Sequence, residues 1–420
     1  MCTMGAARLF PKPPSSDQPR HPNGARDLPT SSANEREVFI QWDGTTRSKF
    51  HHIWLRDHCR CPRCFHSITK QRLINTFEIP SDLEPVSTRS TADGLQVVWS
   101  APTEPHVSIY PWSWLRQNSY STSEKPQPAE KVLWGSKIAK DPPSVSYGEV
   151  MSHDGLGLYR WLSKIDKFGF CFVSGLPATP EATEELSKRI GFIRETHYGK
   201  FWDFTADLAR GDTAYTNIAL PAHTDNTYFT DPCGVQLFHL LEHTDGTGGA
   251  TLLVDGFYVA SILRDLYPEA YSLLSTVSID AHAAGEAGTL YRATHPLLEH
   301  DGFGNIKAVR WNNDDRSALR GVSYSDVPRL YEAMRTWNEL ITSQDSEYWV
   351  QLSPGTAVAI DNHRVLHGRS AFTGIRRMCG AYIGADEFHS RLAVLSEQFA
   401  EQAETKTTGT GERGVWSHEF

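Results

Sequence analysis

From Glu37 onward, the early part of the chain alternates apolar and polar residues, as a half-buried β-strand does. The clearest alternating runs are at residues 38–42, 50–55 and 95–99. A short apolar segment at 112–115 then indicates a short helix. Together these elements predict a small β-rich domain over residues 37–120.

The later part of the chain mixes helical and strand patterns. Helical periodicity marks residues 153–167, and Thr179 followed by Pro180 predicts a helix start, because threonine caps helices and proline fits their first position. Beyond residue 210, short β runs alternate with glycine-containing turns, which favours a jelly roll. Further helices are expected at 257–274, 324–341 and 386–400.

These patterns predict a mainly β protein with flanking helices, in which a double-stranded β-helix (jelly roll) follows a small β-rich domain. Residues 1–36 are rich in proline, serine, arginine and asparagine, and we expect them to be a disordered tail. The remaining predicted boundaries are the small domain at 37–120, a linker at 121–145, the jelly roll at 146–400 and a C-terminal tail at 401–420.

Composition narrows the classes of partner. The chain has 420 residues, and its 41 basic and 50 acidic side chains give a formal charge of −9, which argues against nucleic acid and anionic membranes as partners. No apolar run reaches the roughly 18 residues of a membrane-spanning helix. Four cysteines are scattered outside the one cluster, which fits a reducing compartment. The expected location is the cytoplasm; a mitochondrial matrix location is the alternative, because Asp17 is the single acidic residue before position 27.

His223 and Asp225 form an H-x-D pair, which places an imidazole and a carboxylate on one side of a strand or tight turn. A third ligand from a distant strand would complete two histidines and one carboxylate on one face of a metal. His367 is the candidate for that ligand. Such a facial triad leaves open positions on the metal and is typical of non-haem Fe(II) oxygenases.

The surroundings of His367 suggest an anion anchor. An apolar run at 356–360 leads into it, Arg376 follows nine residues later, and a second strand-like run covers 378–383. Two adjacent strands would bring His367 and Arg376 to one cavity, where the guanidinium matches a carboxylate. This arrangement suits 2-oxoglutarate, while Arg377 is interpreted as an ordinary surface charge.

Three aromatic residues, Tyr198, Trp202 and Tyr215, precede the metal motif. A quaternary ammonium cannot donate a hydrogen bond, so proteins bind it on the faces of several rings. Core packing is the competing interpretation, because aromatic residues at helix-like spacing usually fill a core.

Cys59, Cys61 and Cys64 place three thiols within six residues, as in a zinc knuckle. Free thiols or a disulfide are the alternatives. A structural zinc site needs a fourth ligand, and His58 and His66 lie awkwardly close to the C-x-C.

Residues 221–257, 310–316 (RWNNDDR) and 360–392 resemble the 2-oxoglutarate dioxygenases of carnitine biosynthesis, the gamma-butyrobetaine dioxygenase family within the taurine dioxygenase-like superfamily. The resemblance covers nearly all of the chain after about residue 37. It implies Fe(II), 2-oxoglutarate as cosubstrate, ascorbate that keeps the iron ferrous, and a small N-terminal zinc domain. The residue roles that it implies are His223, Asp225 and His367 as iron ligands, Arg376 with Thr251 as the 2-oxoglutarate site, and His106 as the fourth zinc ligand beside Cys59, Cys61 and Cys64.

The resemblance also makes Tyr198, Trp202 and Tyr215 a trimethylammonium cage. Two substrates of this family differ at the far end, because trimethyllysine carries an α-ammonium that gamma-butyrobetaine lacks. The carboxylate of Asp212 suits that ammonium, and Asn312 would hydrogen-bond the zwitterion. The expected reaction is hydroxylation of N6,N6,N6-trimethyllysine at C3, which gives 3-hydroxy-trimethyllysine, succinate and CO2 as the first step of carnitine biosynthesis.

Two alternatives stay open at this point. The first is a gamma-butyrobetaine hydroxylase that makes carnitine, and the second is a non-catalytic protein that binds a trimethylammonium group. A homodimer is expected, because the last helix, at 386–400, could pack between subunits.

Overall fold

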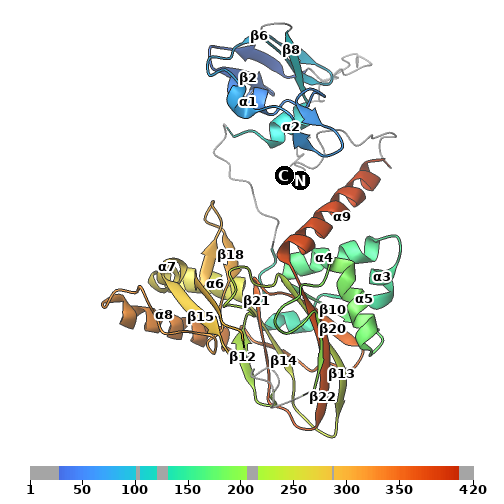
Figure 1. The fold of residues 1–420 in the computed structure, drawn as a ribbon, viewed down its shortest axis with the longest axis vertical. Helices are drawn as coiled ribbons and strands as arrows, with labels where there is room; N and C mark the ends of the chain where they lie inside the picture. Colours follow the sequence, from blue (N-terminus) through green and yellow to red (C-terminus); the bar gives the residue numbers. More distant parts are fainter. Residues whose placement is uncertain (1–27, 101–104, 121–130, 206–215, 286–287, 406–420) are drawn as a thin grey trace, which may run out of the picture. The chain divides into compact units, whose positions relative to one another are not determined.

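A computed structural model describes residues 28–100, 105–120, 131–205, 216–285 and 288–405. Two compact units divide the chain (Figure 1): unit 1 comprises Met1–Glu124 and Glu412–Phe420, and unit 2 comprises Lys125–Gly411. Within the described residues, no helix has the length and apolar character needed to cross a membrane.

Unit 1 contains two antiparallel three-stranded sheets. Their strands are β1 (Thr30–Ala33), β2 (Glu37–Gln41) and β3 (Arg47–His51), and β6 (Pro85–Thr91), β7 (Gly94–Trp99) and β8 (His106–Tyr110). The short elements are α1 (His52–Asp57), β4 (Phe65–His66), β5 (Gln71–Arg72), η1 (Thr76–Glu78) and α2 (Trp112–Gln117). Buried residues from both sheets and both helices, including Phe50, Leu55, Trp99 and Leu115, share one core.

Two sequence predictions for unit 1 need correction. The predicted strand at 50–55 ends at His51, and α1 begins at His52, because His52 and Leu55 are both buried and lie three residues apart on one helix face. The folded part also begins before Glu37. Strand β1, within the predicted tail, pairs with β2 through main-chain hydrogen bonds that its polar side chains do not signal.

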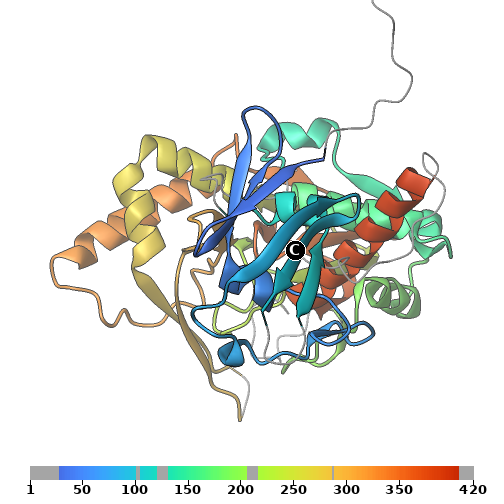
Figure 2. The same ribbon diagram turned by 90° about the horizontal axis from the view of Figure 1, so that it is seen from above.

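Unit 2 is built on two sheets (Figure 1), and Figure 2 shows the helices of this unit from above. The larger has the order β11-β22-β13-β20-β10-β9 and the smaller β12-β21-β14-β19. The larger sheet contains β9 (Ser144–Ser146), β10 (Phe170–Ser174), β11 (Phe201–Phe204), β13 (Val235–Thr244), β20 (Thr356–Asp361) and β22 (Ile375–Ile383). The smaller contains β12 (Leu220–His223), β14 (Thr251–Asp255), β19 (Tyr348–Val350) and β21 (Val365–Arg369). This β-rich mixed architecture with flanking helices agrees with the predicted fold class.

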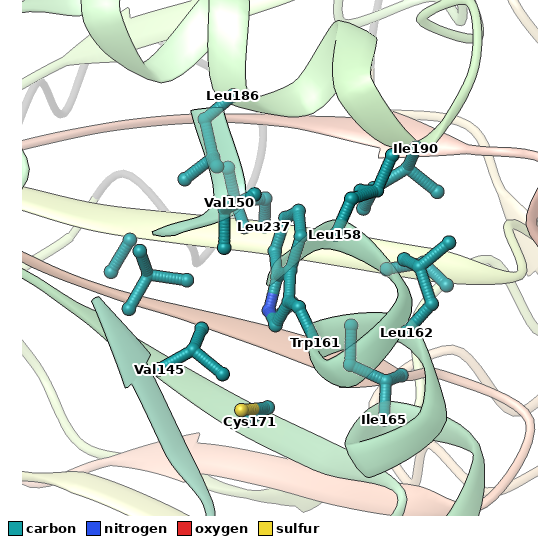
Figure 3. Close-up of a cluster of buried hydrophobic side chains, with 14 of the residues drawn as sticks. Val145, Val150, Leu158, Trp161, Leu162, Ile165, Cys171, Leu186, Ile190 and Leu237 are labelled. Carbon is teal, nitrogen blue, oxygen red and sulfur yellow. The ribbon is translucent and has the colours of Figure 1, made fainter. Parts of the chain in front are cut away.

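Helices cover each sheet through a separate core. The helices α3 (Tyr147–Met151), α4 (Leu156–Phe168), α5 (Pro180–Ile190) and α9 (Ala385–Thr405) pack on the larger sheet, where Trp161 is fully buried among Leu158, Leu186 and Leu237 (Figure 3). The other core joins the smaller sheet to α6 (Gly256–Leu266), α7 (Pro268–Thr276) and α8 (Asp326–Ile341). Two hairpins follow α7, namely β15 (Ser278–Ala283) with β16 (Tyr291–Pro296), and β17 (Leu298–His300) with β18 (Ile306–Val309).

The helix predictions are largely confirmed. Thr179 caps α5 by accepting a hydrogen bond from the backbone N of Ala182, and Pro180 occupies the first helical position. The single helix predicted at 257–274 is instead two helices, because Pro268 restricts Tyr267 and ends α6 before α7 begins.

The predicted linker is only partly a linker. Residues 121–130 lie outside the described residues, whereas the segment from Lys131 to Val145 belongs to unit 2. Trp134 is buried against Phe170, with ring centroids 4.9 Å apart, and β9 adds to the sheet beside β10. The polar stretch at 121–130 suggested a linker, whereas the apolar residues that follow it, including Trp134 and Val145, pack into the fold.

Candidate active site and metal centres

A cavity of about 250 Å³ lies between the two sheets of unit 2. The smaller sheet contributes His223, His367 and Thr251 to its wall, and the larger sheet contributes Trp202 and Arg376. With Asp225, Tyr198 and Asn312, eight of the side chains predicted from the sequence to form the site therefore line this cavity.

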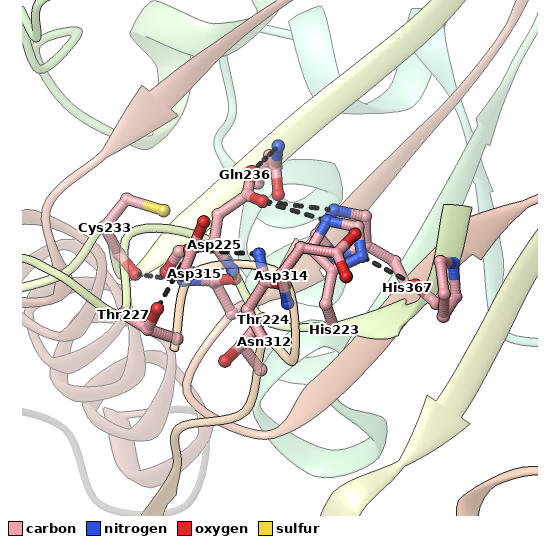
Figure 4. Close-up of polar contacts among 12 residues, drawn as sticks. His223, Thr224, Asp225, Thr227, Cys233, Gln236, Asn312, Asp314, Asp315 and His367 are labelled. Carbon is pink, nitrogen blue, oxygen red and sulfur yellow. Dashed lines mark hydrogen bonds and ion pairs between the residues drawn. The ribbon is translucent and has the colours of Figure 1, made fainter. Parts of the chain in front are cut away.

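His223, Asp225 and His367 lie together in this cavity (Figure 4). Strand β12 pairs His223 with His367 of β21, and the chain turns after His223 so that Asp225 returns to them. One carboxylate oxygen, Oδ1 of Asp225, lies 3.2 Å from Nε2 of His223 and 3.7 Å from Nε2 of His367. Two imidazole nitrogens and one carboxylate oxygen that converge in this way fit the facial triad of an Fe(II) centre.

The second oxygen of Asp225 is held by donors from the larger sheet. Gln236 Nε2 donates to Oδ2 at 2.6 Å and the Tyr382 hydroxyl donates at 2.8 Å. Asn362 fixes the backbone of the same residue, because it accepts from its N–H at 2.7 Å and donates to its carbonyl at 3.0 Å. Oδ1 would thereby be left to bind a metal, because hydrogen bonds to the second oxygen orient a ligating carboxylate.

Electrostatics favour an ionised Asp225 and a neutral His367. Burial alone would raise the pKa of Asp225, but His367, His223 and the Tyr382 hydroxyl outweigh it and hold that pKa below its usual range. Burial and the neighbouring His223 lower the pKa of His367 to about 3. The carboxylate and the imidazole of His367 are thus in the state that metal binding requires. Burial lowers the pKa of His223, but Asp225 and the Pro221 carbonyl outweigh it and raise that pKa, so His223 must lose its proton when it binds a metal.

We predict that Tyr382→Phe weakens Fe(II) binding by roughly 10- to 100-fold, the usual cost of losing an outer partner of a metal ligand. Burial raises the pKa of Tyr382 well above its ordinary value, so its hydroxyl stays a donor to Asp225. Titration of the apoprotein with Fe(II) would measure the change. Tyr271→Phe, which removes a hydroxyl bonded to His300, should leave the affinity unchanged; equal loss in both variants would contradict the assignment.

Arg376 and Thr251 also reach the cavity, but from different sheets. The prediction that the strands of His367 and Arg376 are neighbours is wrong: β21 belongs to the smaller sheet and β22 to the larger. The two residues meet because the sheets face one cavity. Arg376 is 7% exposed, and burial together with the nearby Arg369 lowers its pKa to about 10, so it is still a cation at neutral pH. Arg377 is exposed and bound to Asp203, in line with a surface charge.

The substrate residues are only partly placed. Tyr198, Trp202 and Asn312 line the cavity, whereas Asp212 and Tyr215 lie outside the described residues. Trp202 is a strand residue of β11 and packs edge-on to Tyr382, with ring centroids 5.5 Å apart. The amide nitrogen of Asn312 donates to Asp315 at 3.0 Å.

The sequence analysis missed two residues that contact the predicted site residues. Tyr228, whose hydroxyl lies 3.0 Å from that of Tyr198, also lines the cavity. Gln236 had an available signal, since it is a polar residue among the apolar residues Val235, Leu237 and Phe238 at the start of β13. A buried polar side chain in a central strand needs a partner, and here the partner is Asp225.

In unit 1, Cys59, Cys61, Cys64 and His106 lie together. Their sulfurs are 3.3, 3.7 and 3.6 Å from Nε2 of His106. A tetrahedral ion with bonds of about 2.3 Å to sulfur and about 2.0 Å to nitrogen separates such atoms by roughly 3.5 Å. The hydrogen bond with Cys59 and the charge of Arg56 lower the pKa of Cys64, which favours a thiolate there, whereas the same hydrogen bond and burial raise the pKa of Cys59.

Comparison with known families agrees with the geometry of the cavity. The family described as taurine catabolism dioxygenase TauD, TfdA matches residues 127–382, which is more than half of the chain. The chain belongs to this family. Residues 30–141 match a second family, described as gamma-butyrobetaine hydroxylase-like, N-terminal.

Individual relatives are more specific. A trimethyllysine dioxygenase of Neurospora crassa is 44% identical over 385 residues, which cover 83% of this chain and 81% of that protein. The mitochondrial trimethyllysine dioxygenase of Homo sapiens is 37% identical and covers 90% of each chain. A gamma-butyrobetaine dioxygenase of Pseudomonas sp. is 32% identical, covering 85% of this chain and 93% of its own length.

Proposed function

We propose that this chain hydroxylates N6,N6,N6-trimethyllysine at C3 with Fe(II), 2-oxoglutarate and O2, and so catalyses the first step of carnitine biosynthesis. The observation that carries the proposal is the triad of His223, Asp225 and His367 in one cavity with Arg376 and Trp202. The choice of trimethyllysine as the substrate is supported by the relatives named trimethyllysine dioxygenase, which are up to 44% identical. We infer that the two facing sheets form the double-stranded β-helix expected from the sequence.

The protein's own part in the reaction is to bind and orient. Iron, when bound, supplies the oxidising chemistry that removes hydrogen from an unactivated carbon. Arg376 holds the distal carboxylate of 2-oxoglutarate, and Thr251, which is buried on β14, adds a hydroxyl there. The aromatic faces of Tyr198 and Trp202 hold the trimethylammonium group, so that C3 faces the triad.

Three further residues complete the proposed substrate site. Tyr215 would close the aromatic cage, Asp212 would pair with the α-ammonium, and Asn312 would bind the zwitterion. Asn312 already donates one amide hydrogen to Asp315, and its second hydrogen is available to the substrate.

A competition experiment distinguishes the candidate functions. Purified protein with Fe(II), 2-oxoglutarate and ascorbate would receive equal amounts of trimethyllysine and gamma-butyrobetaine, and mass spectrometry would identify products. One added oxygen on trimethyllysine with matching succinate is expected. Oxygen on gamma-butyrobetaine alone would favour the alternative hydroxylase, and no product from either would favour the non-catalytic binder. Asp212→Asn should lower activity on trimethyllysine and leave activity on gamma-butyrobetaine intact.

The role of Arg376 gives a second prediction. Arg376→Met should raise the KM for 2-oxoglutarate at least roughly 30-fold, the equivalent of the ~2 kcal/mol lost when a buried charge loses its partner. Steady-state kinetics at saturating trimethyllysine would measure it. Arg377→Met is the matched control, because that neighbouring arginine is exposed and pairs with Asp203. A similar rise in both variants would contradict the anchor role.

We propose that Cys59, Cys61, Cys64 and His106 bind a structural Zn²⁺, since four protein ligands leave no open position. Cys64→Ser should abolish the single equivalent of zinc found by elemental analysis and lower the melting temperature of unit 1. Cys171→Ala, which removes a buried thiol from unit 2, should retain zinc. Zinc-free wild-type protein, purified with added zinc, would contradict the assignment.

Three remaining proposals concern the protein's surroundings. Ascorbate would keep the iron ferrous, and omitting it should reduce the turnover number.

A homodimer is also proposed, and light scattering would test it. The human relative is named mitochondrial, which favours the mitochondrial matrix over the cytoplasm expected from the sequence.

A further inference from the structure

Arg369 belongs to the cavity although no motif marks it. It lies two residues after His367 on β21, so both side chains point to the same face of the strand. Register places it opposite Thr251 of β14 and Leu220 of β12. It is 7% exposed and lines the cavity. A buried guanidinium between the ligand histidine and the proposed 2-oxoglutarate site needs a function.

Arg369 and Arg376 both lie against the ring of Phe372. Its guanidinium carbon lies 4.9 Å from the centre of the Phe372 ring, and that of Arg376 lies 5.5 Å from the same ring. Two buried cations on one ring repel each other, and the charge of Arg369 contributes to the lowered pKa of Arg376. An anion bound beside Arg376 would relieve that repulsion and stabilise the pair.

The other end of Arg369 connects it to the segment before the metal ligands. Its Nη2 donates to the carbonyl of Thr216 at 2.7 Å and to that of Ile218 at 3.0 Å. The backbone N of Phe372 donates to the carbonyl of Asn217 at 3.1 Å. Residues 216–218 therefore rest on the same loop that carries Phe372, and they run directly into β12 and His223.

We propose that Arg369 is a positioning residue that couples binding of the 2-oxoglutarate carboxylate to the placement of residues 216–218, and through them to substrate binding. The proposal rests on the function proposed above. Residues 216–218 lead into Leu220, Pro221 and Ala222 of β12, and all three of these residues line the cavity. The carboxylate of 2-oxoglutarate fixes Arg376 and, through it, the Phe372 ring. Phe372 and Arg369 then fix residues 216–218. Trimethyllysine therefore binds to a site whose wall is already in place. The coupling is reciprocal, so substrate must also tighten cosubstrate binding.

Calorimetry on the full-length protein with Fe(II), under anaerobic conditions that prevent turnover, tests the coupling. The Kd for trimethyllysine would be measured with and without saturating 2-oxoglutarate. We expect the cosubstrate to tighten wild-type binding by about tenfold, within the usual range for coupled sites. In Arg369→Met and Arg369→Lys this tightening by 2-oxoglutarate should fall below about twofold. Methionine donates no hydrogen bond, and the ammonium of lysine cannot lie on Phe372 and reach both carbonyls.

Arg376→Met is the comparison variant, since it should lose 2-oxoglutarate affinity itself. Arg369→Lys keeps the positive charge and should therefore keep that affinity within about threefold when trimethyllysine is absent. If Arg369→Met fails to fold in a melting assay, Arg369→Lys decides. Retained coupling in Arg369→Lys would overturn the proposal, as would a loss of 2-oxoglutarate affinity equal to that of Arg376→Met. If wild-type protein does not bind trimethyllysine, the proposed function fails as well; if it binds and hydroxylates trimethyllysine without coupling, only the role of Arg369 fails.

Discussion

Asp225→Asn should reduce trimethyllysine hydroxylation by more than about 100-fold, which exceeds the loss expected from any outer partner of the metal. The substitution keeps the shape of the side chain but leaves it one acceptor oxygen. Gln236 and Tyr382 both donate to the present Oδ2, so the amide oxygen would turn toward them. Its NH2 group would then face the histidines and could not ligate a metal.

The measurement pairs Fe(II) content with succinate and product yields. Asp231→Asn is the control, because Asp231 is an exposed carboxylate bound to Arg194 on the same connection between β12 and β13. It should keep iron and activity. Melting temperatures would show that Asp225→Asn is folded, as its hydrogen bonds to the larger sheet are retained. An Asp225→Asn protein with normal iron content and turnover would rule out the triad.

The chemistry of the site was more predictable than its architecture. His223, Asp225 and His367 are recognisable because a metal needs particular ligand types, and those types survive in the sequence. The sheet that each strand joins depends on pairing over long distances. The sequence therefore suggested adjacent strands for His367 and Arg376, whereas β21 and β22 face each other from different sheets.

Residues that act through others were invisible for a similar reason. Gln236, Asn362 and Arg369 match no ligand motif, and their roles depend on which backbone or side-chain atoms the fold brings near. The boundary between α6 and α7 at Pro268 could have been predicted, since proline restricts the residue before it. The apolar residues continue at helical spacing across Pro268, however, and concealed this boundary. Short-range rules thus predict elements and ligands, and packing decides which elements meet.

The pair of Arg364 and Asp255 shows how a long-range contact supports the site. Both side chains are 0% exposed, and the guanidinium binds the carboxylate through two contacts of 3.0 and 2.8 Å. Asp255 also accepts from the backbone N of Trp134 at 3.1 Å, and Arg364 donates to the carbonyl of Lys167 at 3.0 Å. One buried pair therefore ties the ends of β14 and α4 to the turn before β21, which carries His367.

Asp255→Leu should destabilise unit 2 by about 3–5 kcal/mol, because it leaves a buried cation without its partner. At roughly 2 °C per kcal/mol for a domain of this size, the melting temperature should fall by roughly 6–10 °C. Differential scanning calorimetry would measure the shift. Asp265→Leu is the matched control, since its exposed pair with Arg264 should contribute less than about 1 kcal/mol.

A second variant separates the charge from the packing. Adding Arg364→Met to Asp255→Leu removes the uncompensated cation and should recover part of the lost stability, as replacement of whole buried pairs often does. A double variant less stable than Asp255→Leu would mean that the Arg364 contacts to the carbonyls of Lys167 and Val132 matter more than the ion pair. A melting temperature of Asp255→Leu within 1 °C of wild type, roughly the effect of 0.5 kcal/mol, would show that the pair contributes little to the fold around His367.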